Sequence, residues 1–544
     1  MYIVRKYQRQ VDQFICSGSR NSFALACGLI GLVALGLSLW FLKVGAPGMN
    51  GRAWDSPILL DGGWRVFNGQ VPHKDFYTYL GDLPYYLISL AMKLKGPGMG
   101  AIECGSIFLM WGLVLAALAI LRRRTSASLG FLFALFIALL VVTPRPLGDP
   151  YDYTDHAMVY NRYGEACIAL FGMLMFLWPR PGFGGGRMNW LESAGAGLLL
   201  VLLLGCKLNY FAAAIGFFGV AWLTKRLSTM QAAGILISAT LFFAIALALT
   251  KIPLAAMAND YRIMLGCQSS GTKLRAFAVQ GVKSIFFLPI LLALVWEGFL
   301  PSAESGGFRR LPWRDIFIVL AIFGAATFLI SSNSQIGQMP LLALAALYGA
   351  EMILRQPTSP GDEPYFTVVR HLGAFSIALL FLFPLIVLDV KTDRYVTFAA
   401  VSKRAVSPDF LQSTQLKDFR FVPDGTRSEE IAVYKRQLDE GLQLLRRHPE
   451  AVQRLDILLF SDPYHLALGL APPLGGIICV SPPGINHRSH PALTRLLGSA
   501  THLLTEAGSK DLKEAYGSEW DALNLKVIEE TKSFTLYALP APRE

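Results

Sequence analysis

Apolar runs long enough to cross about 30 Å of hydrocarbon recur along this chain from residue 22 to residue 390. Hydrophobic side chains make up 53% of the 544 residues and charged side chains only 16%, against roughly a quarter in a soluble globular protein. After Lys391 the polar and apolar residues become mixed. We therefore expect a polytopic α-helical membrane domain over residues 1–390 and a small soluble domain over residues 391–544.

The basic residues predict how the chain threads the membrane. Arg5, Lys6 and Arg9 precede the first apolar run and favour a cytoplasmic N-terminus. The triplet Arg122–Arg124 then also lies in the cytoplasm, provided that the short segment 83–95 is a helix in the membrane interface. The pattern predicts about eleven transmembrane helices and an extracytoplasmic C-terminal domain. We expect these helices near residues 22–44, 100–121, 129–143, 164–178, 191–205, 208–224, 231–250, 282–299, 315–331, 339–354 and 371–390.

The remaining composition excludes some functions. The net charge of +11 falls largely in short loops on the cytoplasmic side, so it predicts topology and no nucleic-acid partner. The seven cysteines are scattered without a CxxC pair, which favours packing over disulfides or a metal. The first apolar run lacks a small-residue cleavage site and is expected to remain as an anchor.

Three acids stand in the first predicted outer loop, residues 45–99. An ionised carboxylate at the membrane surface can take a proton from an incoming hydroxyl or amine, and Asp55 is the candidate for this role. The alternative is that Asp55 caps a helix that begins at Pro57. Asp61 precedes two glycines and is expected in a turn. Asp75 is a second functional acid or a partner of Lys74, and Asp82 is expected to cap the interfacial helix.

The second outer loop, residues 144–163, is rich in acids and aromatic rings. Such surfaces suit sugars, because rings stack on pyranose faces and carboxylates accept hydroxyl protons. The same acids, with a histidine, could ligate a divalent metal, and the alternative is a solvated turn with Asx caps. The residues concerned are Asp149, Asp152, Asp155 and His156. Residues 251–281 and 331–338 are the other outward segments, the second with Asn333, Gln335 and Gln338 as weaker sugar contacts.

The first loop resembles a known family. Four features follow one another in this loop: Asp55, an apolar helix, the run Asn68-Gly-Gln-Val-Pro-His-Lys-Asp-Phe76 and the run Gly81-Asp-Leu-Pro-Tyr-Tyr-Leu-Ile-Ser-Leu90. Together they make the loop similar to that of the GT-C membrane glycosyltransferases. The likeness is to the bacterial branch related to protein mannosyltransferases and lipid A aminoarabinose transferases. The chain departs from the family pattern at Ser56, where a glutamate is usual, and at His73 and Lys74. The specific motif is confined to residues 55–90.

The resemblance implies a chemistry. A polyprenyl-phosphate sugar would serve as donor in a bacterial inner membrane, and a cell-envelope glycan, lipid or protein would be the acceptor. Asp55 would be the general base and Asp75 a supporting acid, normally with inversion at the anomeric carbon. No nucleotide is required and no cofactor is certain, although some relatives use a divalent metal. The departing phosphate needs cations, for which the candidates are Lys207, Arg262, Lys273 and Arg275; snorkelling or an amphipathic surface are the alternatives.

The C-terminal region predicts a small α/β domain. The pattern of apolar and polar residues favours strands at residues 455–461, 476–481, 526–529 and 534–539. It favours helices at residues 428–447 and 491–497. Loops at 463–465 and 482–487 could bind a ligand, so acceptor docking or a structural lid is the expected role. Two rivals to the glycosyltransferase remain. One is a flippase for lipid-linked sugars, which should carry charges deep within several spans; the other is a ligase with a diphosphate lipid donor.

Overall fold

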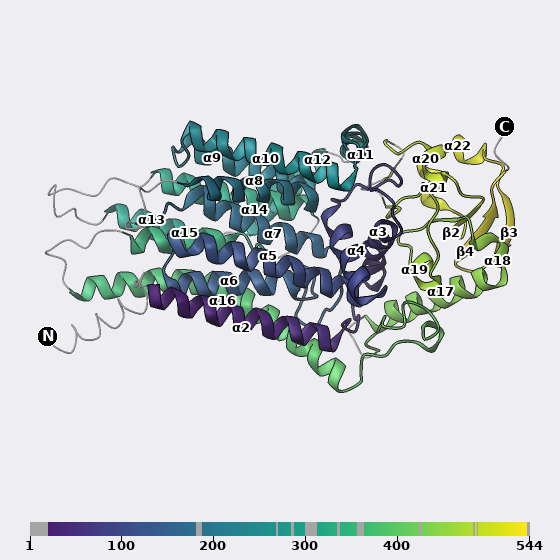
Figure 1. Cartoon of the computed structure of the whole chain (residues 1–544), viewed down its shortest axis with the longest axis horizontal. Coiled ribbons are helices and arrows are strands. Elements are labelled where there is room, and N and C mark those ends of the chain that lie inside the picture. Colours follow the sequence, from purple (N-terminus) through teal and green to yellow (C-terminus); the bar gives the residue numbers. More distant parts are fainter. Residues whose placement is uncertain are drawn as a thin grey trace.

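The computed structural model describes most of the chain from Arg20 onward. The described residues are 20–180, 188–267, 270–283, 288–299, 313–333, 338–355, 364–423, 427–481, 485, 486 and 488–540. Long helices lie side by side in one bundle, and the C-terminal domain covers one end of it (Figure 1). The short helices α3 and α4 lie between the bundle and this domain. The first outer loop and the C-terminal domain are therefore at the same end, as the predicted topology requires.

The helices of the body follow the predicted spans closely. They are α2 (Arg20–Val44), α3 (Ser56–Phe67), α4 (Leu83–Lys95), α5 (Gly100–Arg124), α6 (Ala127–Val142), α7 (Val159–Phe176), α8 (Trp190–Cys206), α9 (Leu208–Leu223), α10 (Thr229–Thr250), α11 (Leu254–Cys267), α12 (Ser270–Lys283), α13 (Leu288–Phe299), α14 (Trp313–Ser332), α15 (Leu342–Leu354) and α16 (Pro364–Val401). The interfacial helix α4 has the bounds that the sequence predicts. Helix α16 runs unbroken past residue 390, and the division of the chain into domains there stays a prediction.

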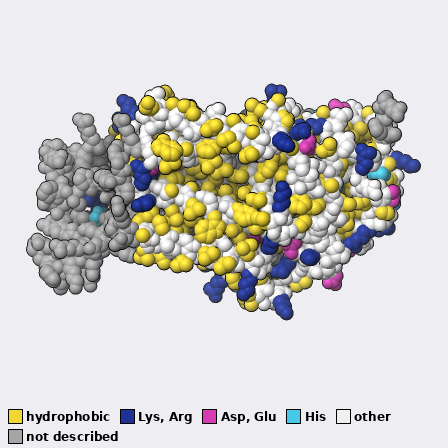
Figure 2. Space-filling view, in the orientation of Figure 1, with side chains coloured by type: hydrophobic (Ala, Val, Ile, Leu, Met, Phe, Trp, Pro, Cys, Tyr) yellow, Lys and Arg dark blue, Asp and Glu magenta, His cyan; other side chains and the backbone are white. Residues whose placement is uncertain are grey.

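The helical body has the apolar surface of a membrane protein. Among the described residues, five helices are long and apolar enough to cross a membrane, namely α2, α5, α10, α14 and α16, and α6, α8, α9 and α15 are shorter apolar helices. Hydrophobic side chains dominate the visible face of this body, whereas charged side chains gather over the C-terminal domain and the junction (Figure 2). The polytopic helical fold is thus confirmed, while the count of eleven spans and their orientation stay predictions.

Residues 251–281 contain α11 and α12 rather than an irregular outer segment. Helix α12 packs against α14, so part of this segment belongs to the bundle. Four large apolar side chains on α12, Leu274, Phe277, Val279 and Val282, are exposed on the surface of the bundle, where lipid would cover them. Lys273 and Arg275 lie beside these residues in the sequence. Their charges make the segment appear polar, although it forms a helix with an apolar surface.

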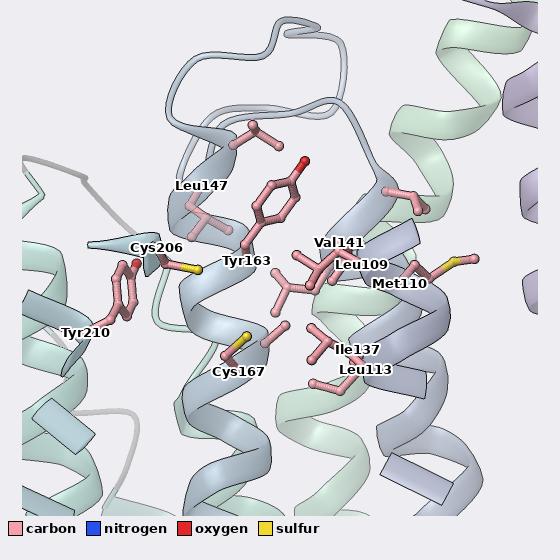
Figure 3. Close-up of a cluster of buried hydrophobic side chains, with 14 of the residues drawn as sticks. Leu109, Met110, Leu113, Ile137, Val141, Leu147, Tyr163, Cys167, Cys206 and Tyr210 are labelled. Atoms are coloured by element: carbon pink, nitrogen blue, oxygen red, sulfur yellow. The ribbon is translucent and has the colours of Figure 1, made fainter. Parts of the chain in front are cut away.

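The core of the body packs tightly around α5, α6 and α7. Figure 3 shows Leu109, Leu113, Ile137 and Val141 close together between these helices. The six described cysteines are free, and five are buried, so packing stays the expectation for their role. Buried ion pairs close the ends of the bundle: Asp389 accepts from Arg145 at 2.8 Å and from Arg162 at 2.7 Å, and Arg180 meets Glu351 at 2.9 Å.

The C-terminal domain is built on a four-stranded sheet with the order β1-β2-β4-β3. Strands β1 and β2 are parallel, and β4 pairs antiparallel with both β2 and β3. The elements are α17 (Ser428–Arg447), α18 (Pro449–Val452), β1 (Leu455–Leu458), α19 (Tyr464–Leu468), α20 (Leu493–Leu497), β2 (His502–Glu506), α21 (Lys510–Tyr516), α22 (Ser518–Asp521), β3 (Lys526–Glu530) and β4 (Phe534–Ala538). The small α/β domain and its closing strand pair are confirmed.

Two strand assignments differ from the sequence prediction. Residues 476–481 are buried but form no strand, since Ile477 only bridges to Tyr77 of the first loop. Gly475 and Gly476 before it have positive φ values of 108° and 80°, which bend the chain out of a ladder. The true partner of β1 is His502–Glu506, whose short apolar centre gives a weak strand signal. The segment at 463–465, predicted as a loop, contributes to helix α19.

Candidate functional site

Asp55 ends a single 3-10 turn, Ala53–Asp55, directly before α3. The turn is held by Asp155 of the second outer loop. One carboxylate oxygen of Asp155 accepts from the Arg52 backbone N–H at 2.9 Å, and the other accepts from the Ala157 N–H at 2.7 Å. Burial raises the pKa of Asp155 to about 7, although these N–H bonds oppose the shift. The two acid-bearing loops that the sequence singles out are therefore joined.

The Asp55 carboxylate is buried without being used by the helix. Asp55 occupies the N-cap position of α3, as the alternative reading expects, but its side chain makes no capping hydrogen bond. The residue is only 9% exposed. Burial raises its pKa to about 6, and the nearby Arg52 opposes this shift. A carboxylate with a pKa near neutrality that is not engaged in capping its helix is suited to accept a proton.

Lys207 faces the same region from the junction of α8 and α9. Its ammonium donates to Asn333 Oδ1 at 2.8 Å and lies 5.2 Å from the centre of the Tyr160 ring. Tyr160 is also within electrostatic reach of the Asp55 carboxylate. The structure thus brings a cation, an aromatic ring and a buried acid to one end of the bundle. Asn333, in turn, donates to Tyr210 Oη at 3.1 Å.

The other acids of the second outer loop do not converge on one point. His156 is buried and contacts Glu103 of α5 at 2.7 Å, and burial lowers the pKa of His156 to about 3. Asp149 is half-buried, with a pKa raised by burial and opposed by arginines, and the backbone carbonyl of Asp152 accepts from Asn50. In the described part of the chain these residues do not form a group that could hold a metal ion. Gln338 accepts from Arg145 and from the Gly148 N–H, both at 3.1 Å.

Asp75 and Asp61 have local partners. The Asp75 carboxylate accepts from the Val71 N–H at 2.8 Å and so closes a turn, and no contact among the described residues joins it to Asp55. Its supporting role in catalysis stays a prediction. The expectation of a turn at Asp61 is wrong, because α3 continues through it and its carboxylate pairs with Arg65 at 3.0 Å. Gly62, after it, is needed for packing, since a Cβ there would lie 2.2 Å from the Tyr85 ring.

The basic residues expected around 262–275 lie apart from this centre. Arg262 on α11 and Arg275 on α12 are exposed, and the side chain of Lys273 lies outside the described residues, as does Gln335. The buried charged residue of α11 is Asp260, which the sequence pattern does not single out. It meets His73 Nδ1 at 3.0 Å and binds Arg495 of the C-terminal domain through both oxygens. This cluster fastens the first loop to α11 and α20.

A second buried ionic cluster joins α3 to the C-terminal domain. Asp61, Asp462 and His465 are the one group of described residues whose ligand atoms are close enough to hold a metal ion. Those atoms are already occupied. Arg65 binds Asp61, Asp462 binds His465 Nδ1, and His465 Nε2 contacts the Leu455 carbonyl at 3.0 Å. Although burial opposes it, Asp462 holds the pKa of His465 above its usual value. The cluster links α3 to the C-terminal domain through buried ion pairs.

An apolar groove lies between α4, α5, α7 and α8. It has a volume of about 520 Å³. Leu83 and Leu87 of α4 line it near the Asp55 end of the bundle, and Arg123 and Glu192 line it at the far end. Gly112 of α5 borders the groove with open space where a side chain would be. A groove of this composition suits a hydrocarbon chain.

No protein-family model matches the sequence, and no curated protein matches it. Among solved structures, ArnT from Cupriavidus metallidurans is similar in its apo state (12% identity, TM-score 0.42) and bound to undecaprenyl phosphate (13% identity, TM-score 0.43). Both similarities cover 94% of this chain and 97% of the other chain. The archaeal oligosaccharyltransferase AglB from Archaeoglobus fulgidus, in complex with an inhibitory peptide and a dolichol-phosphate, is similar at 11% identity and a TM-score of 0.28. That similarity covers 94% of this chain and 74% of the other.

Proposed function

We propose that this protein is a GT-C-type glycosyltransferase that moves a sugar from a polyprenyl-phosphate donor to a cell-envelope acceptor. The observation that carries the proposal is the buried Asp55 carboxylate, which is unused by its helix and has a pKa raised to about 6. It directly precedes α3, which lies with α4 between the bundle and the C-terminal domain (Figure 1). A membrane-borne donor and an aqueous acceptor can both reach such a junction.

The proposed step needs few groups. An acceptor hydroxyl oxygen attacks the anomeric carbon while the bond from that carbon to the phosphate oxygen breaks and its electron pair leaves with the phosphate. Asp55 takes the hydroxyl proton as the new glycosidic bond forms. Attack opposite the leaving phosphate inverts the anomeric centre. Lys207 supports the departing negative charge, because an ammonium near a leaving phosphate lowers the cost of that charge.

The apolar groove provides a place for the donor chain. A prenyl chain is hydrocarbon, and the groove begins beside α4, at the same end of the bundle as Asp55. We place the chain there and the sugar phosphate between Asp55 and Lys207. The outward orientation of this end, which the basic loops predict, belongs to the proposal.

Reconstitution in liposomes separates this enzyme from its rival, a flippase. The purified protein is given a synthetic polyprenyl-phosphate sugar together with envelope extracts as acceptors, and both transfer and lipid translocation are measured. We expect transfer that consumes the donor and releases polyprenyl phosphate. Translocation without any transfer or donor cleavage, across a panel of sugars, would favour the flippase. The buried charges Arg162 and Asp389 are paired with each other, which suits a structural role better than a transport path.

A further inference from the structure

A second cavity opens in the C-terminal domain beside Asp55. It is a cleft of about 590 Å³ between α17, the end of β1 and the start of β4. This volume is in the range of about 300–1,000 Å³ typical of small-ligand sites. Trp54, the residue directly before Asp55, is one of its lining residues although it belongs to the first loop. The cleft therefore extends from the C-terminal domain to the turn that carries the proposed catalytic acid.

Two contacts tie the cleft to Asp55. The rings of Trp54 and Tyr434 meet edge to face with centroids 6.2 Å apart, which fixes the 3-10 turn against α17. Tyr434 is also within electrostatic reach of the Asp55 carboxylate. A ligand held against Trp54 and Tyr434 is thereby beside the group that would take its proton.

The lining combines aromatic rings with polar groups. Trp54 and Phe460 are the partly exposed rings of its wall, and Tyr464 and Phe534, whose rings meet edge to face 5.9 Å apart, are buried within it. The exposed side chain of Gln437 and the hydroxyl of Ser461 supply polar atoms among these rings. Rings that stack on pyranose faces, with amide and hydroxyl groups between them, are suited to sugars.

The charges of the cleft point to a neutral ligand. Arg436 and Lys532 on its wall are balanced by Glu440 and Glu506, so the cleft has no net excess of positive charge. Glu440 is already bound by the N–H and the hydroxyl of Ser533, at 2.9 and 2.7 Å. A phosphorylated or strongly acidic ligand would require an excess of cations.

We infer that this cleft binds a neutral saccharide, which is the acceptor glycan of the reaction. The role of this saccharide as acceptor rests on the proposed function, whereas its binding to the cleft does not require a donor. The cleft holds the sugar chain along α17 and presents its end hydroxyl past Trp54 to Asp55.

The test is binding of oligosaccharides to the full-length protein in detergent micelles. An array of neutral and acidic bacterial oligosaccharides, with a peptide panel beside it, identifies the ligand, and titration then measures its Kd. We expect a neutral oligosaccharide to bind, and Gln437→Ala with Arg436→Ala to weaken it at least tenfold. Gln443→Ala is the matched control, because Gln443 is an exposed residue of the same helix outside the cleft. Thermal melts of each variant confirm that the fold is retained.

The outcomes are distinct. Exclusive binding of acidic glycans or of peptides, binding of no glycan, or equal binding by the cleft variants and Gln443→Ala would overturn the saccharide site. Donor cleavage by the wild-type protein is measured separately. Donor cleavage without glycan binding would exclude the saccharide site and leave the proposed function standing. Glycan binding without cleavage of any donor would support the saccharide site and contradict the proposed function.

Discussion

The raised pKa of Asp55 predicts how the transfer reaction depends on pH. Asp55 acts as a base only when it is ionised, and burial places its pKa at about 6. The rate should therefore fall as the pH drops through about 6. At pH 5 roughly a tenth of the carboxylate is ionised and at pH 7 roughly nine tenths, so we expect kcat/KM at pH 5 to be about one tenth of its value at pH 7. An exposed aspartate would produce no such loss until the pH approached about 4.

Arg52 provides the matched perturbation. Its positive charge lowers the pKa of Asp55 against the effect of burial. Arg52→Gln removes that charge but keeps the backbone N–H that donates to Asp155. We expect the fall in rate on the acidic side to move to higher pH, so that the variant is slowest relative to wild type below about pH 6 and recovers toward pH 8. Because Asp155 is close enough to influence Asp55, this fall in rate reports the titration of both acids together.

The assay is single-donor transfer between pH 4.5 and pH 8.5, with protein stability checked by thermal melts at each pH. Initial rates at low donor concentration give kcat/KM. If kcat/KM falls with a midpoint near pH 4, or if the midpoint does not move in Arg52→Gln, then Asp55 is not the base or is not buried as described. Arg404→Gln is the control for the loss of a cation on the same protein, since Arg404 is exposed beside Phe398.

Three further perturbations test other parts of the structure. Lys207→Gln should lower kcat/KM for the donor at least about tenfold, because a charge-assisted bond to phosphate contributes about 1.5–3 kcal/mol, and initial rates at low donor concentration measure it. Arg495→Ala leaves the buried Asp260 without its cation and should lower the free energy of unfolding by about 3 kcal/mol, seen as a lower melting temperature. An unchanged melting temperature would contradict a stabilising role for the Asp260–Arg495 ion pair. Gly112→Leu fills the apolar groove and should raise KM for a long polyprenyl donor but not for a short-chain analogue. Gly216→Leu, on the lipid-facing side of α9, is its control, and equal effects of both would exclude the groove as the chain site.

Much of the fold follows from local patterns. Helix α4 was predicted to its end residues because Leu83–Lys95 is too short to span and begins with a proline in its first turn. Helix α17 has a strong amphipathic repeat, which gives Ser428–Arg447 without any tertiary information. Strand His502–Glu506 was missed because its five residues carry only a short apolar centre, and its place in the sheet depends on β1 and β4.

The site was predictable only in part. Asp55 stands out because an acid beside a membrane helix is costly to place, and the structure leaves its carboxylate unused. The partners of the predicted residues are distant in sequence, and local patterns do not reveal them. Lys207 and Asn333 are 126 residues apart, and His156 meets Glu103 from 53 residues away. Such pairs form because burial forces isolated charges to find partners.

The central claim is that the Asp55 carboxylate takes the acceptor proton in transfer from a polyprenyl-phosphate sugar. The most direct measurement compares single-turnover transfer by wild type, Asp55→Asn and Asp75→Asn in the same membranes, with donor binding and thermal stability measured in parallel. Asn keeps the size of Asp and removes the base. The account predicts that Asp55→Asn binds donor and remains folded but transfers at least about 100-fold more slowly. Transfer by folded Asp55→Asn within about threefold of wild type would contradict it.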